Sequence, residues 1–313
     1  MTVGWTTSRI PDQTGRTIIV TGANSGLGFE TARALAGAGA LVVMACRDER
    51  RARVAADAIR SDEARGELEI LPLDLASLAS VRDFAKAFSD RHRALHILIN
   101  NAGIMAIPRR TTADGFEMQF GTNHLGHFAL TGLLLERLLA VEGSRVVSLS
   151  STAHKFGRID FDDLQRERSY FRWSVYGQSK LANLHFAYEL ERRFRATQTP
   201  CLSTACHPGW SATNLQYVGA RMEGRGWLES LASGLNRLFS QDAAAGALPT
   251  LYAATAPEAK GGDFFGPDGL GEIKGHPRKV NSSRRSHELE AARRLWEVSE
   301  ELTGVRFDAL AAD

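Results

Sequence analysis

Short apolar segments alternate with longer amphipathic segments along most of the chain. The apolar segments are rich in Val, Ile and Leu, as is typical of strands that are buried on both faces of a sheet. We predict strands at residues 17–20, 41–45, 68–73, 95–99, 145–149, 202–205 and 263–265. Apolar positions with helical spacing predict helices at residues 29–37, 49–61, 78–88, 113–140, 176–195 and 287–302.

This order of strands and helices predicts an α/β fold. Strands that alternate with helices form a parallel sheet, and right-handed crossovers place the helices on both faces of it. No linker rich in Pro, Gly or Ser divides the chain, so we expect a single domain over residues 1–313.

Composition narrows the classes of partner and the cellular location. The net charge is +2, which gives no reason to expect nucleic acid or an anionic membrane as the main partner. The three cysteines, Cys46, Cys201 and Cys206, cannot all pair within the chain, and this favours a reducing, cytoplasmic location. Residues 1–15 are polar, and no apolar run of about eighteen residues predicts an integral membrane segment.

A glycine-rich turn directly follows the first predicted strand and opens the first helix. Its glycines are Gly22, Gly26 and Gly28. Glycine lets the backbone approach a pyrophosphate closely, and the helix N-terminus presents free N–H groups to the phosphates. The alternative is an ordinary strand-to-helix turn. The strand before it and the helix after it favour nucleotide binding, through residues Gly22, Asn24, Ser25, Gly26, Leu27 and Gly28.

The end of the second predicted strand bears on the choice of nucleotide. An acid at this place binds a ribose 2′-hydroxyl, whereas an arginine accommodates a 2′-phosphate. The chain has Arg47 there, which predicts a preference for NADP(H), with NAD(H) as the second choice. Two alternatives stay open: Arg47 could be an ordinary surface residue, and the neighbouring Asp48 could reach a ribose.

Tyr176 and Lys180 lie four residues apart, about one helical turn, so that their side chains project from one face of a helix. A fixed positive charge stabilises a phenolate and lowers the pKa of the tyrosine, which can then act as a general acid or base. Such a pair also occurs by chance in many helices. Its meaning therefore depends on the other motifs.

Together these motifs resemble the short-chain dehydrogenase/reductase family. The matching residues are Thr21-Gly22-x-x-x-Gly26-x-Gly28, Asp74-Leu75, Asn100-Asn101-Ala102-Gly103, Asn123, Ser150-Ser151, Tyr176-x-x-x-Lys180 and Pro208-Gly209. The stretches 45–48, 113–117, 123–128 and 179–183 are similar to the retinol-dehydrogenase-like branch, and plant-type protochlorophyllide reductases share some of them. The membrane-bound retinol enzymes usually carry an apolar N-terminal anchor. The polar N-terminus here is therefore interpreted as that of a soluble, bacterial-type relative.

The resemblance implies a Rossmann-type doubly wound sheet of about seven strands in three αβα layers. It assigns residues 16–210 to the dinucleotide-binding part. The following segment, 211–245, has apolar residues at helical spacing and is either a helix packed on the body or a mobile lid over an apolar substrate; we favour the lid. Residues 246–313 are expected to cover the body.

The resemblance also implies how the cofactor is held. Asp74, with Leu75, would bind the adenine amino group, although Asp74 could also cap the next helix. Asn101, Ala102 and Gly103 would line the adenosine half, and Pro208, Gly209 and Thr213 would hold the carboxamide end. Hydride transfer of this kind needs no metal.

The implied catalytic residues are Asn123, Ser151, Tyr176 and Lys180. Asn123 would hold a water that links Lys180 to solvent, and Ser151 would donate a hydrogen bond to the substrate carbonyl, with Ser148 and Ser150 as alternatives. Tyr176 would transfer the proton, and Lys180 would bind the nicotinamide ribose. Ser151 and Tyr176 are 25 residues apart, so residues 156–172 must loop out for the two side chains to meet.

Two further expectations concern the long central helices. His124 and His127 are spaced for a metal, but packing or polar roles are favoured. Outward apolar stripes could pair two copies into a homodimer or homotetramer, as in relatives. The candidates, some of which must face the sheet instead, are Leu130, Leu133, Leu134, Leu138, Leu181, Leu184 and Phe186.

The sequence thus predicts an NADP(H)-dependent oxidoreductase that transfers a hydride to or from a small apolar aldehyde, ketone or alcohol. A non-catalytic NADP(H)-binding regulator is one alternative. A double-bond reductase similar to protochlorophyllide reductase is another.

Overall fold

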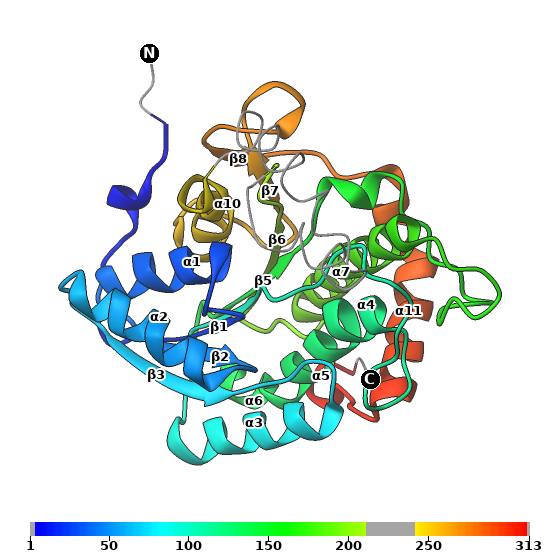
Figure 1. Cartoon of the computed structure of the whole chain (residues 1–313), viewed down its shortest axis with the longest axis horizontal. Coiled ribbons are helices and arrows are strands. Elements are labelled where there is room, and N and C mark those ends of the chain that lie inside the picture. Colours follow the sequence, from blue (N-terminus) through cyan, green and yellow to red (C-terminus); the bar gives the residue numbers. More distant parts are fainter. Residues whose placement is uncertain (1–3, 211–241, 312–313) are drawn as a thin grey trace, which may run out of the picture.

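The computed structural model describes residues 4–210 and 242–311, which share one eight-stranded sheet in the order β3-β2-β1-β4-β5-β6-β7-β8 (Figure 1). The strands are β1 Thr17–Thr21, β2 Leu41–Cys46, β3 Glu67–Pro72, β4 Ile97–Asn100, β5 Arg145–Leu149, β6 Leu202–Cys206, β7 Phe264–Pro267 and β8 Pro277–Lys279. The first seven are parallel, as predicted. The sequence analysis missed β8, which pairs antiparallel with β7 as the return strand of a hairpin.

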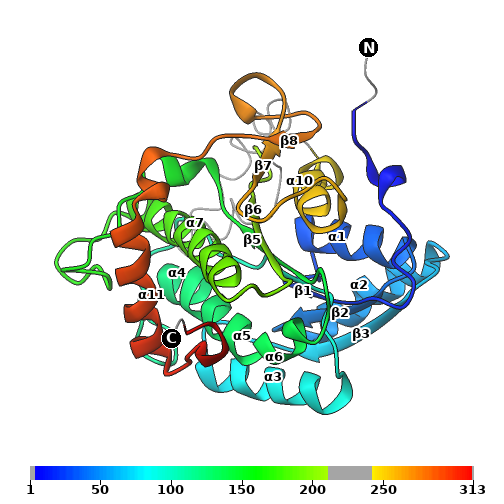
Figure 2. The same cartoon turned by 180° about the vertical axis from the view of Figure 1, so that it is seen from behind.

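Helices cover both faces of the sheet, which confirms the predicted α/β class. They are α1 Gly26–Gly37, α2 Glu49–Ser61, α3 Leu78–Arg91, α4 Met118–Phe120, α5 Gly126–Leu133, α6 Leu135–Leu139, α7 Arg172–Ala196, α10 Ala243–Thr255 and α11 Leu289–Thr303. One apolar core joins the sheet to α1, α2 and α10, and a second joins the other face to α3, α5, α6, α7 and α11 (Figures 1 and 2). Apolar strands buried on both faces follow from this three-layer arrangement.

The strand order reverses between β1 and β4, the two central strands from which the chain winds outward in opposite directions. Loops at the carboxyl ends of such strands diverge and leave a crevice for a ligand. The candidate residues that follow β1, β2, β4, β5 and β6 therefore lie along one edge of the sheet.

The predicted helix over residues 113–140 is wrong at its start and is not continuous. Residues 111–117 form a turn, closed by a bridge between Thr111 and Glu117, and Glu117 then caps α4 by accepting from the N–H groups of Gln119 and Phe120. A π-helical turn at Gly121–Leu125 separates α4 from α5. The apolar pattern identified the buried face of the segment. It did not predict the turn at residues 111–117 or the π-helical turn.

The apolar stripe predicted to face outward is instead covered within the chain. Leu130, Leu134 and Leu138 are fully buried in the core beneath α3, α7 and α11, and Leu133 packs partly against that core. On α7, Leu181, Leu184 and Phe186 are buried too. A homodimer or homotetramer stays a prediction, but it would have to pair through other surfaces.

The C-terminal helix α11 supplies much of that cover. Its Trp296 stacks on Phe186 of α7 at 5.8 Å between ring centroids and meets Phe128 and Phe307 edge-on or tilted. The sequence analysis did not anticipate α10, because a helix that is apolar on most sides lacks an amphipathic stripe.

Of the predicted lid at 211–245, residues 211–241 lie outside the described residues, and Thr213 with them. Residues 242–245 instead begin α10, whose first turn is capped by Asp242 accepting from the N–H of Ala245. No helix in the described part of the chain is long and apolar enough to cross a membrane.

Candidate active site

The glycine turn after β1 has the backbone that its sequence predicts. Gly22 and Gly26 have φ of 68° and 55°, a region in which side chains are strained. Gly28 is required for a different reason: a Cβ there would collide with the Gly22 carbonyl oxygen and lie 2.6 Å from Asn101 Nδ2. The turn is therefore packed directly against the loop that follows β4.

Thr21, the last residue of β1, holds that loop in place. Its Oγ1 accepts from the N–H groups of Asn101 and Ala102, both at 2.9 Å, and its carbonyl accepts from Asn101 Nδ2 at 2.7 Å. These bonds position Asn101 and Ala102 beside Gly22, and their predicted place along the adenosine half of the cofactor stays a prediction. The sequence analysis used Thr21 only as part of the motif and missed this role.

The N-terminus of α1 fits a phosphate group. In the described part of the chain its N-cap, Ser25, makes no side-chain capping bond, so the helix presents its first N–H groups to the crevice. Gly22 and Gly28 lie at the same place, where they let the turn pack directly against Asn101 and Ala102 of the loop after β4. These features fit a dinucleotide with its pyrophosphate at the turn.

The end of β2 carries more positive charge than the sequence analysis recognised. A shallow pocket there is lined by Asn24 on the α1 side and by Asp48, Arg50 and Arg51 on the α2 side. Asp48 is the N-cap of α2, and its Oδ1 accepts from the N–H of Arg51 at 3.0 Å. This bond gives Asp48 a structural role, while Arg47 is exposed beside it.

Asp74 does not cap the helix that follows it, because Ser77 is the N-cap of α3. Its Oδ1 accepts from the N–H of Ala76, and its own N–H donates to Ser80 Oγ at 2.9 Å. Asp74 is therefore held in a turn beyond β3, next to the buried Leu75. This placement leaves the predicted adenine contact as a proposal.

The structure brings Ser151 and Tyr176 together, as the sequence analysis required. Ser151 follows β5 and caps a short 3₁₀ helix, Thr152–Lys155, and its hydroxyl lies near enough to the Tyr176 phenol to lower the pKa of that phenol. The alternative Ser150 donates instead to the Lys180 carbonyl at 2.8 Å, and the alternative Ser148 is buried within β5. Geometry thus favours Ser151 as the partner of Tyr176.

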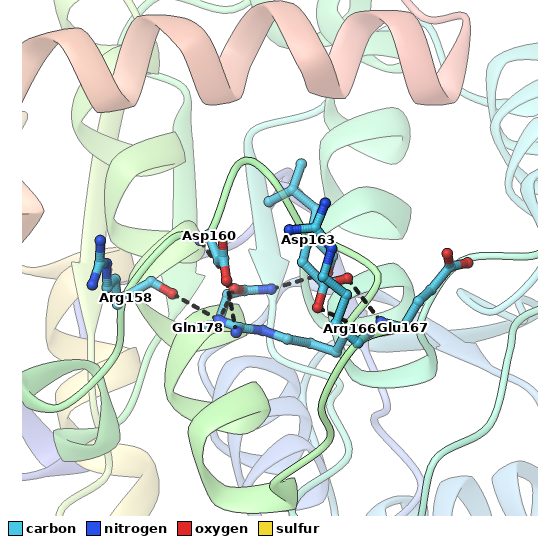
Figure 3. A network of polar contacts seen from close by, with 8 residues as sticks. Arg158, Asp160, Asp163, Arg166, Glu167 and Gln178 are labelled. Carbon is cyan, nitrogen blue, oxygen red and sulfur yellow. Dashed lines mark hydrogen bonds and ion pairs between the residues drawn. The ribbon is translucent and has the colours of Figure 1, made fainter.

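The segment 156–171 loops out between them and is fastened to α7 by Gln178 (Figure 3). Gln178 Oε1 accepts from Arg166 Nη2 at 2.6 Å, and its Nε2 donates to the Leu164 carbonyl at 3.1 Å. Arg166 also donates to Asp160 Oδ2, and Asp163 accepts from the N–H of Glu167. Gln178 is fully buried two residues from Tyr176, so the loop is anchored beside the candidate acid/base.

Burial, not charge, dominates the pKa of Tyr176 in the chain by itself. Burial raises the pKa of Tyr176 to about 12, and only the nearby Ser151 hydroxyl lowers it. Lys180 Nζ lies 5.8 Å from the phenol ring centroid and donates to the Leu149 carbonyl at 3.1 Å. The predicted lowering of the phenol pKa by Lys180 is therefore wrong for the protein alone, because the ammonium is directed at a backbone carbonyl.

Asn123 lies in the π-helical turn with its side chain fully engaged. Its Oδ1 accepts from the N–H of Ile104 at 2.8 Å, and its Nδ2 donates to the Ile104 carbonyl and to Ser179 Oγ, both at 2.9 Å. A Cβ on Gly103 would lie 3.2 Å from Asn123 Oδ1 and 3.5 Å from Lys180 Nζ. The structure thus groups Gly103, Asn123 and Lys180, and the water-holding role stays a proposal.

His127 and His124 have packing roles, as favoured. His127 donates through Nδ1 to the Asn123 carbonyl, and its Nε2 meets Thr21 Oγ1 at 3.0 Å, so it joins the π-helical turn to β1. His124 pairs with Ser299 of α11. Burial lowers the pKa of His124 to about 3 and that of His127 to about 4.

The turn after β6 completes the site edge. Gly209 has a φ of 67°, which the missing side chain permits, and its N–H donates to Nδ1 of the fully buried His207 at 3.2 Å. Pro208 stands between them. This turn ends β6, next to Ser150, whose N–H donates to the Cys206 carbonyl.

Comparison with known proteins identifies the family. The short chain dehydrogenase family matches residues 16–222, about two thirds of the chain. The chain belongs to the short-chain dehydrogenase family. It is 42% identical to retinol dehydrogenase 12 of Homo sapiens over 299 residues, covering 94% of this chain and 88% of the relative. It is 41% identical to retinol dehydrogenase 13 of Homo sapiens over 295 residues, covering 93% and 85%.

Solved structures agree with this assignment. A crystal structure of an uncharacterised protein from Mycobacterium Paratuberculosis matches with a TM-score of 0.80 and 43% identity, covering 97% of this chain and 99% of that one. A short chain dehydrogenase from Shigella flexneri complexed with NADP matches with a TM-score of 0.63 and 21% identity over 82% and 98%, which supports the fold alone. As a member of this short-chain dehydrogenase family, the chain is an oxidoreductase that acts on an alcohol or carbonyl group with a nicotinamide cofactor.

Proposed function

We propose that this short-chain dehydrogenase is an NADP(H)-dependent enzyme that interconverts an apolar aldehyde or ketone with its alcohol, and that Tyr176 is its general acid/base. The closeness of the Ser151 hydroxyl to the Tyr176 phenol carries the proposal, because it brings two hydroxyl groups to one point of the crevice edge. A carbonyl oxygen placed there could accept from both.

The chain's own residues would divide the work as follows. Ser151 donates a hydrogen bond to the carbonyl oxygen and stabilises the negative charge that develops on it. When bound, the nicotinamide supplies the hydride to the carbonyl carbon or takes it in the reverse direction. Tyr176 gives its phenol proton to the same oxygen, which thereby becomes the hydroxyl group of the alcohol and stays bonded to its carbon. Lys180, buried beside the phenol, would bind the nicotinamide ribose.

An apolar substrate is supported by the surface next to the phenol. Trp173 lies one turn before Tyr176 on α7, with the two rings edge to face and 6.3 Å between centroids. Its side chain is 41% exposed, so it offers an aromatic face beside the reacting hydroxyl. The retinol dehydrogenases to which the chain is similar are named for an apolar alcohol, and this is consistent with the same substrate class.

Replacing Tyr176 by Phe tests the acid/base role. We expect turnover to fall by about a thousandfold, since the proton donor is lost, while cofactor affinity is retained. Turnover of a panel of aldehydes, ketones and alcohols would be followed by NADPH absorbance, and binding by NADPH fluorescence. Tyr188→Phe is the matched control, because it removes a buried hydroxyl from the same helix. Full activity in Tyr176→Phe would contradict the role. Wild-type protein that binds NADPH but turns over no substrate would favour a regulator.

Replacing Arg47 by Ala tests the cofactor preference. The exposed guanidinium at the end of β2, with Arg50 and Arg51 nearby, is suited to a 2′-phosphate. We expect the dissociation constant for NADPH to rise about tenfold while that for NADH changes little. Arg53→Ala on the exposed face of α2 is the control. Equal NADPH and NADH affinities in both the wild type and Arg47→Ala would refute the proposal.

A further inference from the structure

The β7–β8 hairpin carries one carboxylate that reaches two separate loops of the candidate site. Glu272 Oε2 lies 3.1 Å from His207 Nε2 and 3.2 Å from Lys155 Nζ. His207 directly precedes the Pro208–Gly209 turn after β6. Lys155 is the last residue of the short helix after β5 that Ser151 caps. One side chain therefore joins the two loops that flank the candidate reaction centre.

The hydrogen-bond pattern defines how His207 takes part. The N–H of Gly209 donates to His207 Nδ1, so this nitrogen is an acceptor and the ring hydrogen is on Nε2. Nε2 faces Glu272. The His207 ring thus contacts Glu272 on one side and the Gly209 turn on the other. His207 is fully buried and lies against Gly266 of β7, where a Cβ would collide with the ring, so it has little room to move.

Backbone contacts also hold the connection between β7 and β8 against the Pro208–Gly209 turn. The N–H of Trp210 donates to the Ile273 carbonyl at 2.9 Å, and a Cβ on Gly209 would lie 3.0 Å from the Glu272 carbonyl. Glu272 itself has a φ of 58°, an unfavourable conformation for a residue with a side chain. Such strain is retained where the surroundings determine the conformation, and it occurs often at functional sites.

The serine loop is bound to the same region by a second route. His154 donates through Nδ1 to the Ser151 carbonyl at 2.6 Å, and its Nε2 accepts from the N–H of Ser283, just beyond β8, at 3.0 Å. Lys155 then adds the ion pair with Glu272. The Ser151 loop is thereby attached to the β7–β8 connection through Glu272 and to the segment after β8 through Ser283.

We propose that Glu272 is a positioning residue that keeps the Ser151 loop and the Pro208–Gly209 turn at a fixed separation. This inference rests on the proposed function, in which Ser151 polarises the substrate carbonyl and the turn holds the nicotinamide end of the cofactor. Glu272 would touch neither the substrate nor the cofactor. It acts on the Ser151 loop through Lys155 and on the Pro208–Gly209 turn through His207. Small displacements of positioned groups cost large factors in rate, so this coupling bears on turnover more than on folding.

The test combines Glu272→Ala, Glu272→Gln, Lys155→Met and the double variant Lys155→Met/Glu272→Gln. Leu270→Ala is the control, since it alters a 97% exposed side chain in the same hairpin. We expect Glu272→Ala to lower kcat/KM about tenfold, with a raised KM for the cofactor and a lowered kcat. Glu272→Gln should retain part of the activity, because a glutamine of the same size can still lie against His207 Nε2 and Lys155. The effects of Lys155→Met and Glu272→Gln should not add.

Hydrogen exchange provides a readout that does not depend on turnover. In Glu272→Ala we expect faster exchange in peptides that span residues 150–156 and 206–210 together, with both unchanged in Leu270→Ala. Glu272→Gln and Lys155→Met alter partly exposed side chains. If Glu272→Ala does not fold, hydrogen exchange of the two loops in these variants tests the coupling instead.

The outcomes separate the two proposals. Kinetics within twofold of Leu270→Ala, or exchange that changes in only one of the two loops, would overturn the coupling role. A wild-type protein without turnover would instead overturn the proposed function, and the exchange data would still decide whether Glu272 couples the loops.

Discussion

At the residue scale, Lys180 is held in a place that costs stability. Its ammonium is buried, and burial lowers the pKa of Lys180 to about 8. Its Nζ donates to the Leu149 carbonyl, but Asn183 Nδ2 donates to the same oxygen at 2.9 Å, so the fold does not need the lysine there. The residue is better explained by what it would do for a bound nucleotide and for Tyr176.

Lys180→Met should therefore stabilise the protein alone while it abolishes turnover. The fall in pKa from 10.5 to about 8 corresponds to a cost on the order of 3 kcal/mol for burying the charged form. Because the folded-state pKa is the lower one, this cost is fully present below pH 8 and disappears as the pH rises to 10.5. The midpoint of thermal unfolding should rise at pH 7, and the gain should shrink by pH 10.

The control is Lys86→Met, which removes an exposed lysine from α3. A Lys180→Met variant that is no more stable than this control at pH 7 would show that the buried ammonium is not costly.

At the element scale, the first turn of α1 carries the sharpest steric requirement. Gly28→Ala places a methyl group against the Gly22 carbonyl and Asn101, two rigid parts of the wall. We expect loss of measurable nucleotide binding and a lower unfolding temperature, since neither neighbour is a flexible side-chain end. Binding would be measured by NADPH fluorescence and stability by calorimetry.

Gly37→Ala is the matched control in the same helix, because a Cβ at Gly37 meets nothing within 4 Å in the described structure. It should be neutral or stabilising by about 0.5–1 kcal/mol. Equal behaviour of the two variants would show that the close packing at Gly28 does not matter.

The sequence predicted these elements unevenly, for physical reasons. Buried parallel strands and the glycine turn have strong local patterns, so β1 to β7 and residues 22–28 were recognised. The π-helical turn at Asn123 accompanies a hydrogen bond from His127 Nδ1 to the Asn123 carbonyl, and the spacing of apolar residues does not reveal either feature. Glu272 lies 117 residues from Lys155, so no local pattern could pair them. The pKa of Tyr176 follows from burial, which spacing alone does not give.

At the scale of the whole molecule, four buried histidines link stability to pH. Burial lowers the pKa of His124 to about 3, and the pKa values of His127, His154 and His185 to about 4. The unfolded chain binds protons at these groups near pH 6.5, before the folded chain does. Their stabilising effect is therefore present above pH 6.5 and is lost as the pH falls towards 4.

The unfolding free energy should thus decline steadily from pH 7 to pH 5, by up to about 1.4 kcal/mol per pH unit for each group. Urea unfolding at several pH values would measure the slope. His185→Leu removes one of the four groups and should make the slope shallower. An unfolding free energy that stays constant between pH 7 and pH 5 would contradict the assignment of neutral, buried imidazoles.

The loop at 156–171 has a consequence for how the chain can vary in length. Gln178 of α7 holds the loop at Arg166 (Figure 3), and the exposed tip, residues 167–169, directly follows Arg166 in the chain. Residues added at the tip would extend into solvent without changing the distance between Ser151 and Tyr176. The tip is therefore a place to graft an epitope or a reporter peptide, close to the reaction centre in space but mechanically separate from it.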